Sequence, residues 1–311
     1  MHELLRRLLP IFFLLAIGFI AKHKKIFQES FIEGLKTLIV KIALPAVLFD
    51  AFSKMTLQIS YLLLFIFVFF YCCLLYFLGH LLHKLFPKIY RRAYTAGYFT
   101  GFEFGMIGVG LFGAIWGMDK LPIIMLIGFG HELFIWFFFV PLISRKKDHR
   151  FNIIDTLWQF LKTPTIIAII SGILINLSGI YPKIEESSIG GSILAVIEFL
   201  KPLTSPLILI VIGYTLIFHR ENLREMAVYI LSRLALVMVL GAILLLTVRF
   251  LIPDLDPLFD QAFYAFILLP APYILPLYIQ DKKEAAFFTQ LLVYSTVVSF
   301  IGYAILVGVS F

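Results

Sequence analysis

The sequence has few charged residues and almost no cysteine. Only 14% of its 311 residues are Asp, Glu, Lys or Arg, while 61% are hydrophobic, and this balance excludes an ordinary soluble globular domain. The two cysteines, Cys72 and Cys73, are adjacent in an apolar run. The sequence therefore offers neither a disulfide framework nor the cysteine spacing of a metal site, and we predict no bound metal.

Motifs for phosphate binding and hydrolysis are also missing. The sequence contains no Walker-type phosphate loop, no HExxH pair and no serine nucleophile elbow, so neither direct use of ATP nor common hydrolytic chemistry is expected. We predict that the protein is not an enzyme and needs no cofactor. Its net charge of +7 comes from short loops between apolar runs, which indicates membrane topology and not a nucleic-acid partner.

Ten apolar runs are long enough to cross a bilayer, at about 20 residues per helix. Backbone polar groups in lipid must be paired within their own segment, so each run is predicted to be a helix. The predicted spans are 4–21, 29–51, 58–80, 93–117, 121–143, 162–181, 190–217, 225–251, 260–280 and 284–310. We expect an all-α multi-pass protein of the cell membrane.

The loops alternate in charge along the chain. The five loops that follow the odd-numbered spans, among them AKHKK and SRKKDHR, hold fifteen of the 26 Lys and Arg residues. The positive-inside rule places these loops in the cytoplasm and both termini outside. With five spans in each half, the two halves would lie in opposite orientation, as in inverted-repeat transporters.

Spans four and nine contain helix breakers near their centres. These are Gly105, Gly108 and Gly110 in span four, and Pro270, Pro272 and Pro276 in span nine. Glycine loosens a helix, and proline cannot donate the helical hydrogen bond. Interruptions at matching places in two inverted halves indicate a substrate site at the membrane midplane, where the broken helices would cross. For the glycines alone, the alternative is close helix packing.

Glu103 is the only acidic residue in span four. A charge in hydrocarbon costs at least a few kcal/mol, so a carboxylate there predicts a function. A neighbouring helix N-terminus would favour its ionised form and desolvation its protonated form, so Glu103 could exchange a proton for substrate. The alternatives are a static pair with Arg233 of span eight, or a sodium ligand.

Other ionisable residues within the spans are further candidates. Lys41 lies four residues before Pro45 in span two and either attracts an anionic substrate or extends to the cytoplasmic interface. His131 and Glu132 are adjacent in span five and form either a proton relay or two separate interhelical hydrogen bonds, because sequential side chains point in different directions. Arg233 would supply positive potential.

Several stretches carry a family resemblance. In chain order they include LPIFFLLAIGFIAKHKKIF, LIVKIALPAVLFDAF, FEFGMIGVGLFGAIWG, LKTPTIIAIISGILINLSGI and PLILIVIGYTL. Over about residues 4–310 their order and spacing resemble the auxin efflux carrier family, which includes plant auxin exporters and bacterial organic-acid permeases. Pro45 and the proline-rich segment with Pro270 and Pro272 match the family's pattern.

The resemblance implies a ten-helix inverted repeat similar to that of bile-acid sodium symporters, with helices four and nine broken and crossing. Scaffold parts would comprise 1–57 and 151–221, and transport parts 58–150 and 222–311. The transport parts would move against the scaffold, in an elevator-like form of alternating access. Two copies would pair through their scaffold helices.

Span four departs from the family's pattern, which is approximately Asn-Thr-x-x-x-Gly-x-Pro, and keeps only the glycine among its distinctive positions. Gly108 keeps the motif glycine, Gly110 stands at the proline, and Glu103 stands at the asparagine beside the substrate. A fixed charge there would repel an organic anion by more than thermal energy. Either Glu103 is protonated when substrate binds, or the substrate is not a simple carboxylate.

The sequence thus predicts a secondary transporter of a small organic solute. The expected substrate is an organic anion, either auxin-like or a mono- or dicarboxylate, with proton coupling through Glu103. A sodium-coupled symporter of the same fold and a ligand-binding membrane sensor are the alternatives. A membrane-embedded enzyme that uses His131, Glu132 and Glu103 is a further rival, which the missing motifs disfavour.

Overall fold

A computed structural model describes the chain except residues 1, 57, 59–60, 145–152 and 311. The described residues form helices, turns and loops without a β-strand, as the apolar composition predicts. The predicted basic loop SRKKDHR lies almost wholly outside the described residues, as do the predicted boundaries between 57 and 58 and between 150 and 151.

Among the residues that the structure describes, six helical segments are long and apolar enough to cross a membrane. They cover Tyr61–Leu85, Thr95–Trp116, Met118–Ile143, Ser188–Thr215, Leu223–Leu251 and Lys282–Val309. Predicted spans one and six contain the shorter apolar helices Leu8–His23 and Pro164–Ser178. Span two is helical but carries several charged residues, and span nine is interrupted. The all-helical class is confirmed, while the inverted ten-span repeat stays a prediction.

The chain divides into two compact units. Unit 1 comprises Met1–Gln58, Gly105–Pro122 and Leu157–Leu216, and unit 2 comprises Ile59–Phe104, Ile123–Thr156 and Ile217–Phe311. The assignment of chain segments to a moving part and a scaffold stays a prediction. Segment 105–122, which the sequence places in a transport part, has its contacts in unit 1.

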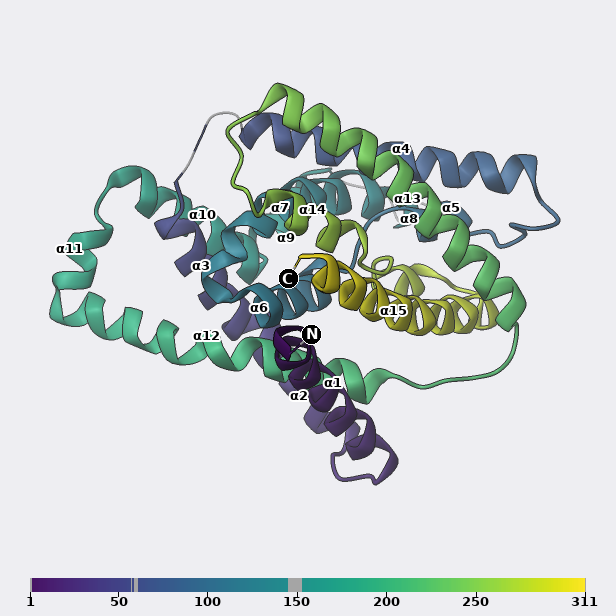
Figure 1. Cartoon of the computed structure of the whole chain (residues 1–311), viewed down its shortest axis with the longest axis horizontal. Helices are drawn as coiled ribbons and strands as arrows, with labels where there is room; N and C mark the ends of the chain where they lie inside the picture. The colour runs from purple at the N-terminus through teal and green to yellow at the C-terminus, as the bar shows by residue number, and fades with distance from the viewer. Residues whose placement is uncertain (1, 57, 59–60, 145–152, 311) are drawn as a thin grey trace. The chain divides into compact units, whose positions relative to one another are not determined.

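Unit 1 is built on two helix pairs. Its elements are α1 His2–His23, α2 Glu29–Leu38, the π-helical turn η1 Ile39–Ala43, α3 Leu44–Lys54, α6 Val109–Trp116, the 3-10 turn η3 Met118–Lys120, α10 Pro164–Ser178, α11 Tyr181–Glu186 and α12 Ser188–Thr215. Helix α1 packs against α12, and α3 against α10 (Figure 1).

Glycines set the close approach of α1 and α12. A Cβ atom on Gly18 would overlap the carbonyl oxygen of Ile210, and a Cβ on Gly213 would overlap that of Leu15. Each helix therefore supplies a glycine where the other's backbone passes, which is the small-residue packing typical of membrane helices.

A buried ion cluster joins α3 and α12 in the same unit. Lys201 is 7% exposed, and its Nζ lies 2.7 Å from Asp50 and 3.1 Å from Glu198. The other oxygen of Asp50 is 2.6 Å from Lys54. Asp119 lies 3.8 Å from the Nζ of Lys201, so the buried Asp50 and Lys201 each have partners of opposite charge, as a buried charge requires.

Unit 2 contains the remaining long helices. Its elements are α4 Tyr61–Leu85, α5 Thr95–Phe99, most of α7 Leu121–Phe134, the π-helical turn η4 Ile135–Phe139, α8 Val140–Ser144, α13 Leu223–Leu251, α14 Phe259–Ile267, the 3-10 turn η6 Leu275–Tyr278 and α15 Lys282–Ser310. The π-helical turn η2 Phe104–Gly108 and α9 Ile153–Leu161 lie across unit boundaries. Helix α4 packs against α5 and along α13 (Figure 1).

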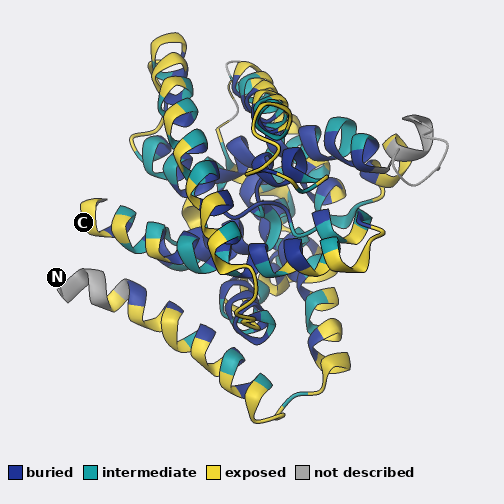
Figure 2. Ribbon diagram, turned by 90° about the vertical axis from the view of Figure 1, so that its right-hand side faces the viewer, coloured by how far each residue is buried: buried dark blue, intermediate teal, exposed yellow. Residues whose placement is uncertain are grey.

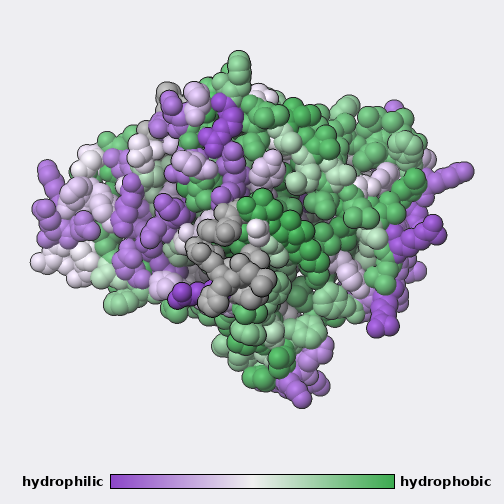
Figure 3. Space-filling view, in the orientation of Figure 1, coloured by the Kyte–Doolittle hydropathy of each residue, from purple (hydrophilic) through white to green (hydrophobic). Residues whose placement is uncertain are grey.

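Many helices expose an apolar face. The N-terminal helix is largely yellow in Figure 2, and its exposed large side chains are Leu9, Phe12, Phe13, Ile17 and Ile20. Broad green areas of apolar side chains cover the face shown in Figure 3, with hydrophilic clusters between them. Such surfaces are suited to lipid and not to water.

Candidate functional site

The predicted fourth span is interrupted at Thr100–Glu103. Helix α5 ends at Phe99, Thr100 is extended, and helical turns resume at Phe104. Gly101 lies in the interruption with φ of +64°. This value is in the left-handed region, which residues other than glycine rarely adopt. Gly101 thus follows the end of α5. The predicted break at Gly105, Gly108 and Gly110 lies earlier in the chain, because these glycines belong to the helical turns from Phe104 to Trp116.

The predicted ninth span is interrupted between α14 and η6. Helix α14 ends at Ile267, and residues 270–272, which include Pro270 and Pro272, are not helical. Two prolines in three residues remove two backbone donors and fix φ, so the α-helix cannot continue. Pro276 lies in the short 3-10 turn that follows.

The two interruptions contact each other. The backbone N–H of Glu103 donates to the carbonyl oxygen of Pro270 at 2.9 Å, and one carboxylate oxygen of Glu103 accepts from the backbone N–H of Tyr273 at 2.8 Å. A Cβ atom on Gly101 would lie only 2.6 Å from the Pro272 ring. Glu103 therefore binds the opposite segment through its main chain and its side chain together.

His131 holds the first interruption from α7. The backbone N–H of Phe102 donates to its Nε2 at 2.9 Å, so Nε2 is unprotonated and the neutral ring carries its proton on Nδ1. The side chain is 1% exposed, and Nδ1 has no hydrogen-bond partner. The nearest charge is the carboxylate of Glu132, at 3.7 Å, beyond hydrogen-bond distance.

Arg233 reaches both interruptions from α13. It is 5% exposed and donates to three backbone carbonyls, those of Tyr98 at 3.0 Å, Gly101 at 2.7 Å and Leu269 at 3.1 Å. These carbonyls lie at the ends of α5 and α14, where a helix leaves acceptors unpaired.

Helix α15 supports the same region with hydroxyl groups. Tyr98 is hydrogen-bonded to Ser295 at 2.7 Å, and Tyr273 to Thr296 at 2.5 Å. Each interrupted segment therefore has a tyrosine bound to the same turn of one continuous helix, which fixes the spacing of the two segments.

The predicted site residues fall into two groups. Glu103, His131, Glu132, Arg233, Pro270 and Pro272 belong to unit 2, and Lys41, Pro45, Gly105, Gly108 and Gly110 belong to unit 1. Lys41 is exposed in η1, and Pro45 is half-buried at the start of α3. Gly110 packs against Ile208 of α12, whereas a Cβ atom on Gly105 would meet no atom within 4 Å.

The sequence gives no sign of a site role for two residues at the interruptions, Gly101 and Tyr273. Gly101 is one of several glycines in span four and lies two residues before Glu103, but its residue type does not distinguish it from the helical glycines that follow. Tyr273 contributes its backbone N–H, and a main-chain contact leaves no signal in the residue type.

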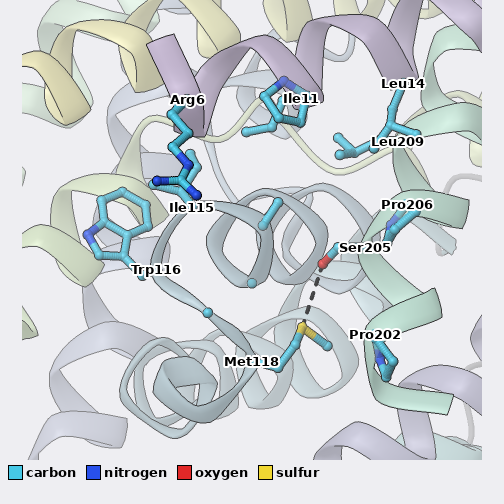
Figure 4. Close-up of a pocket in the computed structure, with 14 residues that line it drawn as sticks. Arg6, Ile11, Leu14, Ile115, Trp116, Met118, Pro202, Ser205, Pro206 and Leu209 are labelled. Atoms are coloured by element: carbon cyan, nitrogen blue, oxygen red, sulfur yellow. Dashed lines mark hydrogen bonds between the residues drawn. The ribbon is translucent and has the colours of Figure 1, made fainter. Parts of the chain in front are cut away.

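A separate cavity lies within unit 1. Its volume is about 1010 Å³, and α1, α6, η3 and α12 form its walls. Figure 4 shows Arg6 directed toward Ile115 and Trp116, and Ser205 donating to the sulfur of Met118 at 3.6 Å. The walls are otherwise apolar, and none of the predicted site residues lines this cavity.

Outside the spans, Arg92 joins three elements of unit 2. Hydrogen bonds to Glu225, at 2.8 Å, and Glu284, at 3.0 Å, raise the pKa of Arg92. The carboxylate of Asp281 caps α15, and the N–H groups of Glu284 and Lys283 that it accepts lower the pKa of Asp281. These contacts fix the helix ends that hold α13 and α15.

Among the residues that the structure describes, no three His, Cys, Asp or Glu side chains are placed to hold a metal ion.

A comparison with protein families matches residues 4–153 to the family described as membrane transport protein. This finding confirms the family resemblance, and the family consists of transporters rather than enzymes. No match was found among curated proteins. Residues 4–153 of the chain thus match the membrane transport protein family, which is that of the auxin efflux carriers, and this match indicates a membrane transporter.

Proposed function

We propose that this protein is a secondary transporter of a small organic anion, that the anion binds where the two interruptions meet, and that a proton on Glu103 is coupled to its movement. The supporting observation is the pair of hydrogen bonds between Glu103 and the ninth span. A half-buried carboxylate accepts an N–H from one interrupted segment while it belongs to the other.

The charge of the region supports an anion. Arg233 is a permanent cation at both interruptions, and an ionised Glu103 would offset it. At about 4 Å and an effective dielectric constant of about 20, two like charges repel by about 4 kcal/mol. An anion would therefore bind when Glu103 is protonated, and deprotonation would favour its release.

Protonation also changes the contact between the segments. The ionised carboxylate accepts the Tyr273 N–H strongly, and a neutral carboxyl group accepts it more weakly. The proton would thus loosen the Glu103 side-chain bond to the ninth span while it admits the anion. One residue would link the proton, the substrate and the two interrupted segments.

We also propose the larger motion and assembly that the family resemblance implies. The transport parts, 58–150 and 222–311, would move against the scaffold parts, 1–57 and 151–221, in an elevator-like cycle. Two copies would pair through scaffold helices in a cell membrane, with both termini outside.

The test is uptake of labelled carboxylic acids into proteoliposomes with and without an imposed pH gradient. We expect the gradient to accelerate uptake by the unchanged protein. Glu103→Gln keeps an acceptor for the Tyr273 N–H but cannot exchange a proton, so its substrate exchange should be insensitive to the gradient.

Glu186→Gln is the matched control, because it neutralises an exposed carboxylate at the end of α11. This variant should keep the pH response of the unchanged protein. The proposal is wrong if Glu103→Gln retains the same pH response, or if amines are transported and carboxylic acids are not.

A further inference from the structure

The guanidinium group of Arg233 occupies a position lined by carbonyl oxygens. Each of its three nitrogens donates to a different backbone carbonyl, at 3.0 Å, 2.7 Å and 3.1 Å. Tyr98 and Gly101 supply two of these from the fourth span, and Leu269 supplies the third from the ninth span. One side chain therefore satisfies acceptors of both interruptions.

Such carbonyl groups have the chemistry of a cation site. The last carbonyls of a helix lack intrahelical donors and carry the negative end of the helix dipole. Broken helices of membrane transporters use such groups to bind sodium ions or protons. In this protein the cation is the guanidinium group of Arg233, and three such carbonyl oxygens accept its hydrogen bonds.

Aromatic rings complete the enclosure. The guanidinium carbon of Arg233 lies 5.1 Å from the ring centre of Phe102 and 5.8 Å from that of Tyr98. The faces of aromatic rings attract cations, and the side chain is buried. The position thus combines carbonyl acceptors, ring faces and exclusion of water around one cation.

We infer that Arg233 is a resident cation that takes the place of a coupling sodium ion at the two interruptions. This inference rests on the proposed transport site. It adds that this site does not use sodium as a coupling ion. The carbonyls that would bind sodium are already bound to the guanidinium group. Transport is therefore independent of sodium, and removal of the side chain creates a site for a small cation.

The experiment uses the full-length protein and the variant Arg233→Ala. Thermal unfolding is followed with millimolar guanidinium, sodium or choline chloride. Guanidinium should raise the melting temperature of Arg233→Ala in a saturable way, because a ligand bound only to the folded state stabilises it. The unchanged protein should show no such rise, and its uptake should be equal in sodium and choline buffers.

Two further variants make the test specific. Arg224→Ala removes an exposed guanidinium group from the same helix and should give no saturable response to guanidinium. Arg233→Lys keeps the charge but not the three-way geometry, so it should retain more uptake than Arg233→Ala. For Arg233→Ala, we expect uptake to fall at least about tenfold, which corresponds to one lost charge-assisted hydrogen bond or more, and guanidinium should restore part of it.

Three results would overturn the inference. They are sodium dependence of uptake by the unchanged protein, a saturable sodium-specific rise in its melting temperature, and an equal response of Arg233→Ala to guanidinium and choline. The thermal measurements require no transported substrate, so they test Arg233 even if the proposed transport of anions fails. If Arg233→Ala does not fold, the sodium measurements on the unchanged protein still decide the matter.

Discussion

Substitution of Gly101 by alanine gives the sharpest test of the contact between the two interruptions. Gly101 has φ of +64°, and a Cβ atom there would lie 2.6 Å from Cγ of Pro272 and 3.2 Å from Ile135. The proline ring is rigid, so it cannot rotate away as a long side chain would. Gly101→Ala must therefore strain the first interruption or push the second one aside.

The two effects can be estimated separately. Alanine in the left-handed region costs roughly 1–2 kcal/mol, and overpacking of a close contact costs typically about 1–3 kcal/mol. Together they predict a loss of about 2–5 kcal/mol in the free energy of unfolding. A shift of the segments would also lengthen the bonds of Glu103 to Pro270 and Tyr273, so transport should fall as well.

The assay is thermal unfolding of the purified protein in detergent, with Gly105→Ala as the control. A Cβ atom at Gly105 would meet nothing within 4 Å, and alanine favours helical turns over glycine by roughly 0.5–1 kcal/mol. Gly101→Ala should melt roughly 4 °C or more below the unchanged protein, and Gly105→Ala should not. Equal melting temperatures for the two variants would refute the described contact.

Three other predictions follow from single contacts. His131→Phe removes the acceptor for the Phe102 N–H and should lower the free energy of unfolding by roughly 1–3 kcal/mol, measured by thermal unfolding; an unchanged value would exclude this hydrogen bond. Lys201→Met should lower the free energy of unfolding by roughly 1–3 kcal/mol because it removes one of the two donors to the buried carboxylate of Asp50, while Lys54 remains, and Asp50→Asn in the same chain should recover part of the loss; no recovery would contradict the ion cluster. Asp281 has a lowered pKa in the folded state, so its capping contribution is complete above its unfolded pKa of about 4 and is lost as the pH falls through the folded value. The difference in melting temperature between Asp281→Asn and the unchanged protein should therefore be present at neutral pH and vanish in acid, and a difference that persists in acid would contradict this capping role.

The helical class and the interruption of the ninth span could be predicted because they depend on local physics, whereas the break predicted at Gly105, Gly108 and Gly110 lies several residues earlier, at Thr100–Glu103. Long apolar runs must pair their own backbone in lipid, and Pro270 and Pro272 remove two backbone donors within three residues. The start of the first interruption could not be read from glycine content, because a glycine inside a helix and one in a left-handed turn look alike in the sequence. Gly105 and Gly108 are helical, while Gly101 is not.

The partners of the candidate site depended on tertiary structure. Glu103 and Arg233 were recognisable as costly charges in apolar segments. Arg233 binds the carbonyls of Gly101 and Leu269, and Glu103 accepts the N–H of Tyr273. These contacts follow only from the packing of α13 and the ninth span against the first interruption.

The sequence by itself determined that this protein is a helical membrane protein with interrupted spans, because hydropathy, loop charge and helix-breaking residues act over short stretches of chain. Only the tertiary structure decided which backbone groups the side chains of Glu103 and Arg233 bind. Those groups lie between 36 and 170 residues away along the chain, and a backbone N–H or carbonyl is the same chemical group whatever residue carries it.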